Sequence, residues 1–323
     1  FSKFEIKSDK AHQELQKICT ANIKKDAGKC TYTHMLNSDG GIEADLTVVS
    51  VDENHFRIIS SAATRERDKH HIKKHLNKDI ELEDVTDDYC VFGLFGPKSR
   101  DLMNSLSNDN FSNENFRFGT AKFISIEDTK IWTQRLSYVG ELGYELYVEV
   151  KDAKKIYELI VNKGKDFNLS NCGMHAMDIM RMESGFLHWG HDISPEENQY
   201  QAGLSFTISN KKNVDFIGKR ALEKIDKKKI KTRFAMFTLK DSKPGEPLLL
   251  HDEPIYLKDQ MIGKSTSGNY SFNFKKNLTF GYISNNFSNE QLKNSELFIE
   301  VEKKKYEIEI INKPLKQTNF KSN

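Results

Sequence analysis

Short stretches that alternate apolar and polar residues run through the first two thirds of the chain, and segments with helical periodicity separate them. The alternation predicts strands at Tyr32–Leu36, Ile42–Val51, His55–Ile59, Tyr89–Leu94, Ala121–Ile126, Ile131–Ser137 and Tyr144–Val150. The helical spacing predicts helices at Asp9–Asn22, with Ser8 as its N-cap, and at Ala62–Leu76, Lys98–Leu106, Asp152–Lys165, Cys172–Glu183 and Phe216–Ile225. Strands that return through turns favour an antiparallel α+β fold over a doubly wound parallel sheet.

The pattern changes after the basic run "EKIDKKKIKTR", which has few apolar residues and is typical of a linker. Short strand-like segments follow it, separated by Gly, Pro, Asn or Asp, and no long helix interrupts them. This spacing predicts a small β-barrel. We therefore expect two domains, residues 1–228 and residues 229–323, in agreement with a length of 323 residues.

The strand that begins at Ile42 carries an acid that its conformation does not favour. Ile42, Ala44, Leu46 and Val48 alternate with the residues between them, so Asp45 and Thr47 point to the opposite face, about 7 Å apart by strand rise. Aspartate is a poor strand former, so strand propensity does not explain why an aspartate stands at position 45. The pattern alone leaves open whether this is a solvated polar face or a site.

Two further stretches are candidates. In "SYVGELGYELYVEV" a glycine-bracketed turn leads into a strand that places Glu145 on the face opposite Tyr144 and Leu146. Asp178 and Arg181 lie three residues apart on a predicted helix and can form an ion pair, which favours a structural role.

Charge and composition exclude several classes of function. The 49 Lys and Arg residues nearly balance the 47 Asp and Glu residues, so the net charge of +2 gives no reason to expect nucleic acid as a partner. The four cysteines lie far apart, which indicates reduced thiols, and no apolar run reaches the ~20 residues of a membrane span. We expect a small-molecule ligand and a location in the cytoplasm, or in the mitochondrial matrix of a eukaryote.

Signatures of metal, nucleophile and nucleotide sites are missing or weak. His71 and His75 have the spacing of a helical zinc pair, but no glutamate follows the first histidine and lysines surround both, so we predict no metal. The sequence holds no G-x-S-x-G elbow, no phosphate-binding P-loop motif and no G-x-G-x-x-G fingerprint.

Five separated blocks together resemble the aminomethyltransferase (glycine-cleavage T-protein) superfamily. They are "MLNSDGGIEADLTV", "SYVGELGYELYV", "HAMDIMRMESGFLHWGHDISPEENQYQAGL", "FIGKRAL" and "EPIYLKDQMIGKSTSGNYSFNFKKNLTFGYI", and they occur in the family's order. "GGIEADLTV", "YVGELGYE" and "HWGHD" are similar to the C-terminal, tetrahydrofolate-binding part of dimethylglycine and sarcosine dehydrogenases. Free-standing T-proteins usually carry an arginine where Met177 stands, and that folate-holding arginine is absent here.

The resemblance implies a function for the acid in the strand. In this family the acid matching Asp45 meets the bridging nitrogens of the folate as the catalytic group, and the positions matching Thr47, Tyr138 and Glu145 contact the pterin. An upstream flavin domain with FAD would oxidise an N-methyl amine to an iminium or release formaldehyde. The carbon would then be captured as 5,10-methylenetetrahydrofolate, and a carboxylate would assist the proton movement. The start on Phe1, inside a predicted strand, suggests that upstream sequence is missing.

Two other interpretations remain open. A free-standing T-protein would take an aminomethyl group from a lipoyl carrier protein. A non-catalytic folate-binding relative of the iron–sulfur maintenance type is less favoured, because the family's "KGCY-x-GQ" block corresponds here to "EENQYQAGL", which has no cysteine.

Overall fold

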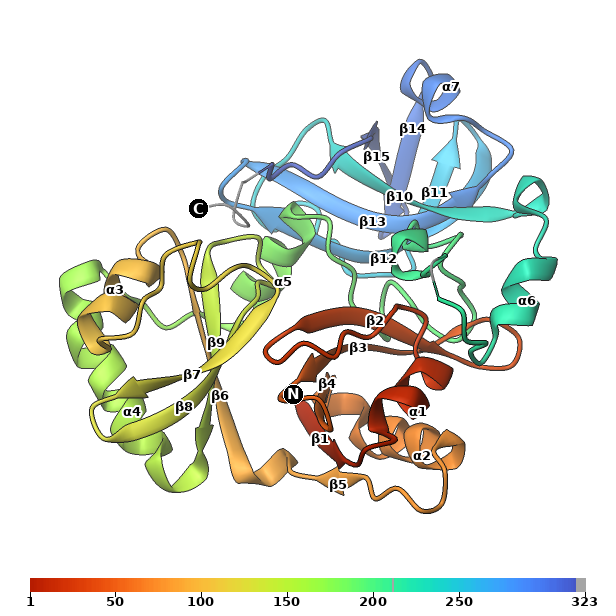
Figure 1. Cartoon of the computed structure of the whole chain (residues 1–323). Coiled ribbons are helices and arrows are strands. Elements are labelled where there is room, and N and C mark those ends of the chain that lie inside the picture. The colour runs from red at the N-terminus through yellow and green to blue at the C-terminus, as the bar shows by residue number, and fades with distance from the viewer. Residues whose placement is uncertain (211, 318–323) are drawn as a thin grey trace.

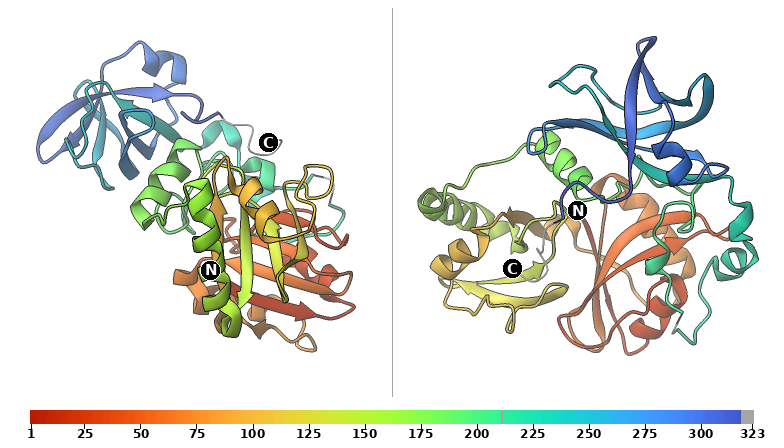
Figure 2. Two further views of the ribbon diagram at one scale, coloured as in Figure 1. Left: turned by 90° about the vertical axis from the view of Figure 1, so that its left-hand side faces the viewer. Right: turned by 90° about the horizontal axis from the view of Figure 1, so that it is seen from above.

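A computed structural model of the chain describes residues 1–210 and 212–317. It contains two antiparallel sheets and a closed barrel, arranged as Figures 1 and 2 show. The pairings between named strands in these residues are all antiparallel. The predicted α+β class and the predicted barrel are both confirmed.

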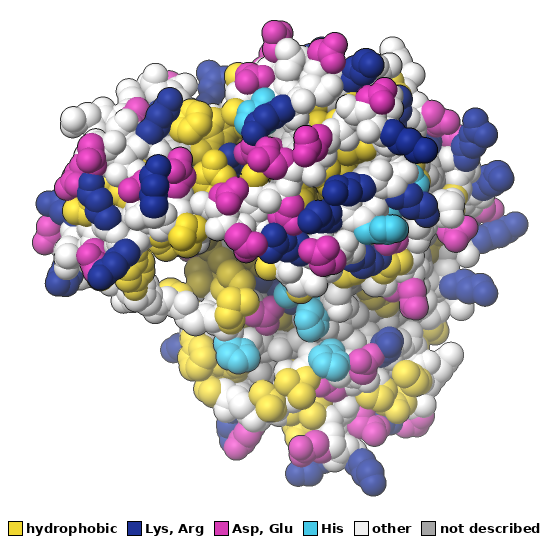
Figure 3. Space-filling view, turned by 90° about the horizontal axis from the view of Figure 1, so that it is seen from below, with side chains coloured by type: hydrophobic (Ala, Val, Ile, Leu, Met, Phe, Trp, Pro, Cys, Tyr) yellow, Lys and Arg dark blue, Asp and Glu magenta, His cyan; other side chains and the backbone are white. Residues whose placement is uncertain are grey.

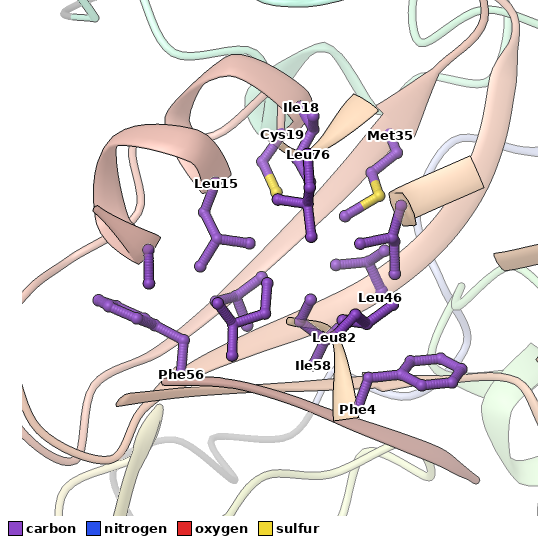
Figure 4. Packing of buried hydrophobic residues seen from close by; sticks show 14 of the residues in the cluster. Phe4, Leu15, Ile18, Cys19, Met35, Leu46, Phe56, Ile58, Leu76 and Leu82 are labelled. Atoms are coloured by element: carbon purple, nitrogen blue, oxygen red, sulfur yellow. The ribbon is translucent and has the colours of Figure 1, made fainter. Parts of the chain in front are cut away.

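The first sheet has five strands, in the order β2 (Cys30–Leu36), β3 (Ile42–Ser50), β4 (His55–Ser60), β1 (Ser2–Lys7) and β5 (Glu83–Asp84). Two helices, α1 (Ala11–Ile18) and α2 (Arg65–His75), lie over one of its faces. Apolar side chains fill the space between helices and sheet, among them Phe4, Leu15, Leu46, Phe56 and Ile58 (Figure 4). This face is therefore a closed hydrophobic core.

The second sheet has four strands, in the order β6 (Tyr89–Phe95), β9 (Gly143–Glu149), β8 (Thr129–Arg135) and β7 (Thr120–Ile126). Its outer face carries α3 (Ser99–Leu106) and α4 (Val150–Gly164). Leu102 and Met103 of α3 and Ile156 and Ile160 of α4 pack there against the strands. With both outer faces covered by helices, the inner faces of the two sheets are left to meet each other.

One apolar cluster holds the inner faces of the sheets together. Val49 and Ile59 from the first sheet pack against Ala121, Trp132 and Tyr147 from the second. Because side chains on a strand alternate between faces, this contact fixes which other residues of the same strands lie between the sheets. The layers follow the order helices, sheet, sheet, helices.

The barrel closes through the order β10 (Thr232–Leu239), β13 (Lys276–Ser284), β12 (Gln260–Ser271), β11 (Pro254–Leu257), β14 (Leu297–Val301) and β15 (Lys304–Ile311). Helices α5 (Met174–Glu183) and α6 (Lys219–Lys224) precede the barrel in the chain, and α7 (Asn289–Lys293) belongs to the connection from β13 to β14. The barrel has its own apolar core. Because β10 begins at Thr232, we keep the boundary between residues 228 and 229 as a proposal.

The first-sheet core generates a stability prediction. Leu46 is 3% exposed and lies next to Asp45 on the opposite face of β3. Leu46→Ala should lower the free energy of unfolding by about 2–5 kcal/mol, because it removes buried methyl groups and leaves a cavity. Chemical denaturation is the measurement. Leu250→Ala makes the same change at a 58% exposed side chain and should stay within about 0.5 kcal/mol of the parent; equal losses in both variants would contradict the placement of Leu46.

Candidate functional site between the sheets

Strand β3 presents its acid toward the space between the sheets. Ala44, Leu46 and Val48 lie in the core under α1, whereas Val49 lies in the cluster that joins the sheets. Asp45 and Thr47 share the face of Val49, as the alternation predicted. The two residues are therefore on an inner face, and the solvated-surface interpretation does not describe their position.

The neighbouring strand β2 adds two groups to this face. In the antiparallel register His34 lies opposite Asp45, and Tyr32 lies opposite Thr47. The Nε2 atom of His34 is 3.6 Å from Oδ1 of Asp45 and 3.3 Å from the hydroxyl oxygen of Tyr32. Sequence reasoning missed both residues, although their alternation with the core residue Met35 carried the signal.

Strand β9 supplies the second acid. Tyr144, Leu146 and Val148 face the core under α3 and α4. Glu145 shares the opposite face with Tyr147, which belongs to the cluster that joins the sheets. The hydroxyl of Tyr147 donates to Oε2 of Glu145 at 3.0 Å. Asp45 and Glu145 thus face the same inter-sheet space from different sheets.

Tyr138 lies in the connection between β8 and β9. Its hydroxyl donates to the carbonyl of Leu187 at 3.3 Å, and its ring stacks on Phe186 with centroids 6.4 Å apart. Gly140 shapes this connection, because its φ of +66° and the Ser184 hydroxyl, 2.0 Å from where a Cβ would stand, together exclude a side chain. The connection is therefore held against the C-terminal end of α5, with Tyr138 close enough to Asp45 to feel its charge.

Several polar atoms in the inter-sheet space have no partner in the protein. Gln134 of β8 is fully buried, lies opposite Glu145 in the register, and leaves both Oε1 and Nε2 without a hydrogen bond. Oδ1 of Asp45 and Nε1 of Trp132 are likewise buried without a partner. Buried polar groups are normally satisfied, so this concentration indicates a place for a polar ligand. Gln134 is, after Tyr32 and His34, a third residue that the sequence reasoning missed.

Burial controls the ionisation of both acids. It raises the pKa of Asp45 to about 7, and the negative charge of Asp68 acts in the same direction, while the Tyr32 hydroxyl opposes it. Burial also raises the pKa of Glu145 to about 7, against the hydrogen bond from Tyr147. Carboxyl groups that titrate near neutral pH can gain or lose a proton during a reaction.

The loop after α5 closes over the beginning of β3. The indole nitrogen of Trp189 donates to the carbonyl of Ile42 at 3.0 Å, and the amide of Ile42 donates to the carbonyl of Glu197 at 2.9 Å. A Cβ on Gly41 would lie 1.8 Å from the carbonyl oxygen of Pro195, so only glycine fits at this approach. Trp189 therefore has a structural contact at this strand.

The predicted ion pair on α5 is confirmed and extends further. The Nε of Arg181 donates to Asp178 at 2.9 Å, its NH1 group bonds Asp192, and NH2 donates to Ser267 of the barrel at 2.8 Å. This buried cation joins α5, the following loop and the barrel. Its role is structural, as its spacing from Asp178 predicted.

Metal and membrane interpretations gain no support within residues 1–210 and 212–317. No group of three or more His, Cys, Asp or Glu side chains in these residues is placed to hold a metal ion. His71 and His75 pack edge to face, with ring centroids 4.7 Å apart. None of the helices in this part of the chain is long and apolar enough to cross a membrane.

The face of the molecule seen from below shows charges of both signs. Seen from below, Lys and Arg side chains are interspersed with Asp and Glu side chains (Figure 3). The same face is hollowed at one side, where hydrophobic side chains line the recess. This mixture of charges does not favour nucleic acid as a partner of this face.

Comparison with known proteins identifies the family. Residues 1–212 match the model of the GCVT N-terminal domain, and residues 233–316 match that of the glycine cleavage T-protein C-terminal barrel domain. The chain superposes on the glycine cleavage system aminomethyltransferase T from Bartonella henselae with a TM-score of 0.86, covering 98% of this chain and 84% of that one. At 19% identity this likeness shows the fold alone.

Curated relatives are of two kinds. Dimethylglycine dehydrogenase from Rattus norvegicus is 33% identical over 98% of the chain, and 4-methylaminobutanoate oxidase (formaldehyde-forming) from Paenarthrobacter nicotinovorans is 35% identical over 84%. The chain spans only 36% and 32% of the lengths of these two proteins. Aminomethyltransferase from Halothermothrix orenii is 31% identical over 84% of the chain and 75% of its own length.

The unpartnered groups fit the ligand that the family implies. Tetrahydrofolate carries a pterin ring with adjacent N–H donors and a carbonyl acceptor, and a buried amide such as Gln134, with carboxyl groups such as Asp45 and Glu145, can satisfy both kinds of group. The resemblance read from the five sequence blocks is confirmed. The chain belongs to the glycine-cleavage T-protein (GCV_T) family, whose chemistry is folate-dependent one-carbon transfer.

Proposed function

We propose that the chain is the folate-binding part of an N-methyl amine dehydrogenase related to dimethylglycine and sarcosine dehydrogenases. In this role it captures the oxidised N-methyl carbon as 5,10-methylenetetrahydrofolate. The observation that carries the proposal is the pair of carboxyl groups of the largely buried Asp45 and the buried Glu145, which face one inter-sheet space and whose pKa values burial raises to about 7.

The roles of individual residues follow from their places. Glu145 and the amide of Gln134 lie opposite each other on β9 and β8 and would hold the pterin edge. Thr47 on β3 and Tyr138 beside the loop would bound the ring from the other side. Tetrahydrofolate, when bound, supplies the two nitrogens that accept the one-carbon unit. Asp45 would hold or release a proton at these nitrogens, because its pKa of about 7 makes both forms accessible.

The dehydrogenase context rests on the relatives and on one sequence difference. Both longer relatives exceed the chain in length by more than a factor of two, so an oxidising domain with FAD would lie upstream. That domain would supply an iminium or formaldehyde to the folate site. Met177, which stands where free T-proteins usually carry arginine, also favours this context. Selection of the amine would belong to the upstream domain.

A free-standing aminomethyltransferase is the second candidate. The chain covers 75% of the Halothermothrix orenii aminomethyltransferase at 31% identity, which is the observation in its favour. The length of the open reading frame distinguishes the two candidates: an upstream flavin-binding sequence in the same frame supports the dehydrogenase, and its absence supports the transferase.

The first prediction about the proposed site concerns folate binding. Calorimetry on the chain should detect tetrahydrofolate binding without any flavin, and Glu145→Gln should weaken it by about 1.5–3 kcal/mol, because a charge-assisted acceptor is lost in a buried place. Glu149→Gln changes the exposed end of the same strand and should leave the dissociation constant unchanged. A folded chain that binds no folate would refute the proposed function.

The second prediction concerns the reaction. In the full-length enzyme, Asp45→Asn should lower formation of methylenetetrahydrofolate by roughly 10²–10⁴-fold, the usual contribution of a positioned acid–base group. Amine oxidation should continue, with formaldehyde escaping, because the two sites act in succession. Asp39→Asn, in the exposed turn before β3, is the control. Product formation within about twofold of the parent at saturating folate would exclude Asp45 as the catalytic group.

The third prediction concerns stability and pH. The pKa of Asp45 rises from an ordinary 3.8 to about 7 on folding, so ionising it is less favourable in the folded state. The parent should therefore lose stability as pH rises from about 4 to about 7, and this loss should level off above pH 7. Asp45→Asn lacks this loss, so its stability advantage should grow across the same range in denaturation curves. Parallel curves for parent and variant would contradict the raised pKa.

A further inference from the structure

The buried side chain of His34 is held by a hydroxyl that leaves it one tautomer. The Oγ1 atom of Thr207, in the 3₁₀ turn Ser205–Thr207, is 3.0 Å from Nδ1 of His34. The same hydroxyl donates its only proton to the carbonyl of Leu204 at 2.8 Å. Thr207 can then only accept from His34, so Nδ1 carries the imidazole proton and Nε2 presents a lone pair.

That lone pair faces the hydroxyl of Tyr32 and the carboxyl group of Asp45. Nε2 of His34 is 3.3 Å from the oxygen of Tyr32 and 3.6 Å from Oδ1 of Asp45. If Asp45 is ionised, the phenol of Tyr32 provides one proton for two acceptors, and either His34 or Asp45 is left without a donor from the protein. If Asp45 is protonated, two protons serve the two acceptors, and Oδ1 of Asp45, which has no hydrogen bond in the present geometry, can gain one to His34.

We propose that His34 is a positioning residue that keeps a proton on Asp45. Its Nε2, fixed as an acceptor by Thr207, lies 3.6 Å from Oδ1 of Asp45 and takes a hydrogen bond from the protonated carboxyl group once a small side-chain movement shortens this distance. The network joins two consecutive strands, β2 and β3, to the turn at Thr207, which lies far from them in the sequence. His34, Tyr32 and Thr207 take no part in the reaction themselves. Together they determine whether the proton resides on Asp45.

The surroundings agree with this placement. Burial lowers the pKa of His34 to about 3, so the proton belongs to Asp45 and not to an imidazolium. Burial also raises the pKa of Tyr32 well above its ordinary value, so the phenol keeps its proton. The ionisable groups that act on Asp45 or lie beside it are His34 and Tyr32 on β2, Glu43 on β3, Arg67 and Asp68 on α2, and Tyr138 before β9. Arg67 forms an ion pair with Glu43 and lies over the ring of Trp189, so it does not pair with Asp45.

For catalysis, this hydrogen-bond network provides a neutral carboxylic acid, Asp45, that can donate its proton. Asp45 would bring its own proton to a folate nitrogen and, once ionised, would accept one back. This last step rests on the proposed function, whereas the placement of the proton is a property of the protein without any ligand.

The first test is the tautomer in the parent protein. ¹⁵N NMR of the histidine-labelled chain, without ligand, distinguishes a protonated Nδ1 from a protonated Nε2. We expect His34, assigned by its loss in His34→Gln, to be neutral with the proton on Nδ1 from pH 5 to pH 8. A proton on Nε2, or an imidazolium in this range, would overturn the proposal without any folding question.

The second test changes the tautomer from a distance. Thr207→Val removes the hydroxyl with little change of shape, so the imidazole proton can move to Nε2 and donate to an ionised Asp45. The titration midpoint of the Asp45 carboxyl carbon, followed by ¹³C NMR, should fall by about one to two pH units, the value of one hydrogen bond to a charged group. Thr279→Val removes a buried hydroxyl bond to the carbonyl of Ser267 in the barrel and should leave the midpoint unchanged.

His34→Gln supplies an independent variant in case Thr207→Val does not fold. A glutamine amide can turn its NH₂ group toward an ionised carboxylate, so the Asp45 midpoint should again fall. An unmoved midpoint in a folded variant of either kind would overturn the proposal. Because these readings need no folate, a failure of folate binding would refute the proposed function and leave this result standing.

Discussion

The contact between the two sheets is the constraint on which the site depends. Val49 and Ile59 meet Ala121, Trp132 and Tyr147 in one apolar cluster, and no other large set of buried apolar residues joins the inner faces in the described part of the chain. Since strands alternate with period two, this contact also fixes where Asp45, Glu145 and Gln134 point. The position of the two acids relative to each other therefore depends on this cluster.

Buried charge is treated in two different ways in this fold. Arg181 is surrounded by Asp178, Asp192 and Ser267, so its burial is matched by acceptors and contributes to the joining of the barrel. Asp45 and Gln134 have buried atoms without partners. An unsatisfied buried polar group costs free energy, and such costs are commonly retained where a ligand supplies the missing partner. The contrast separates a structural ion pair from a candidate binding site.

The sequence was sufficient for the elements and for the faces of single strands. Alternation placed Asp45 and Thr47 on one face, and most predicted strands agree with the structure within about two residues. The predicted cap was wrong: α1 begins at Ala11, and Ser8 instead accepts from the amide of Lys10 at 3.2 Å in a local turn.

The opposition of His34 to Asp45 could not be predicted, because it depends on the pairing register of two strands. The register of β2 and β3 shifts between Met35 and Leu36, and a slip of one residue exchanges the two faces of a strand.

The barrel is connected to the site through the first residue of β3, Ile42. Hydroxyls of Thr266 and Ser267 on β12 donate to Asp192, the second of these at 2.8 Å, and the amide of His188 donates to the same carboxylate at 3.0 Å. The loop so fixed bonds both backbone groups of Ile42 through Trp189 and Glu197. Ile42 begins the strand three residues before Asp45. The barrel therefore contributes to the site by holding the start of β3, which explains in physical terms why a domain without inter-sheet residues accompanies the two sheets.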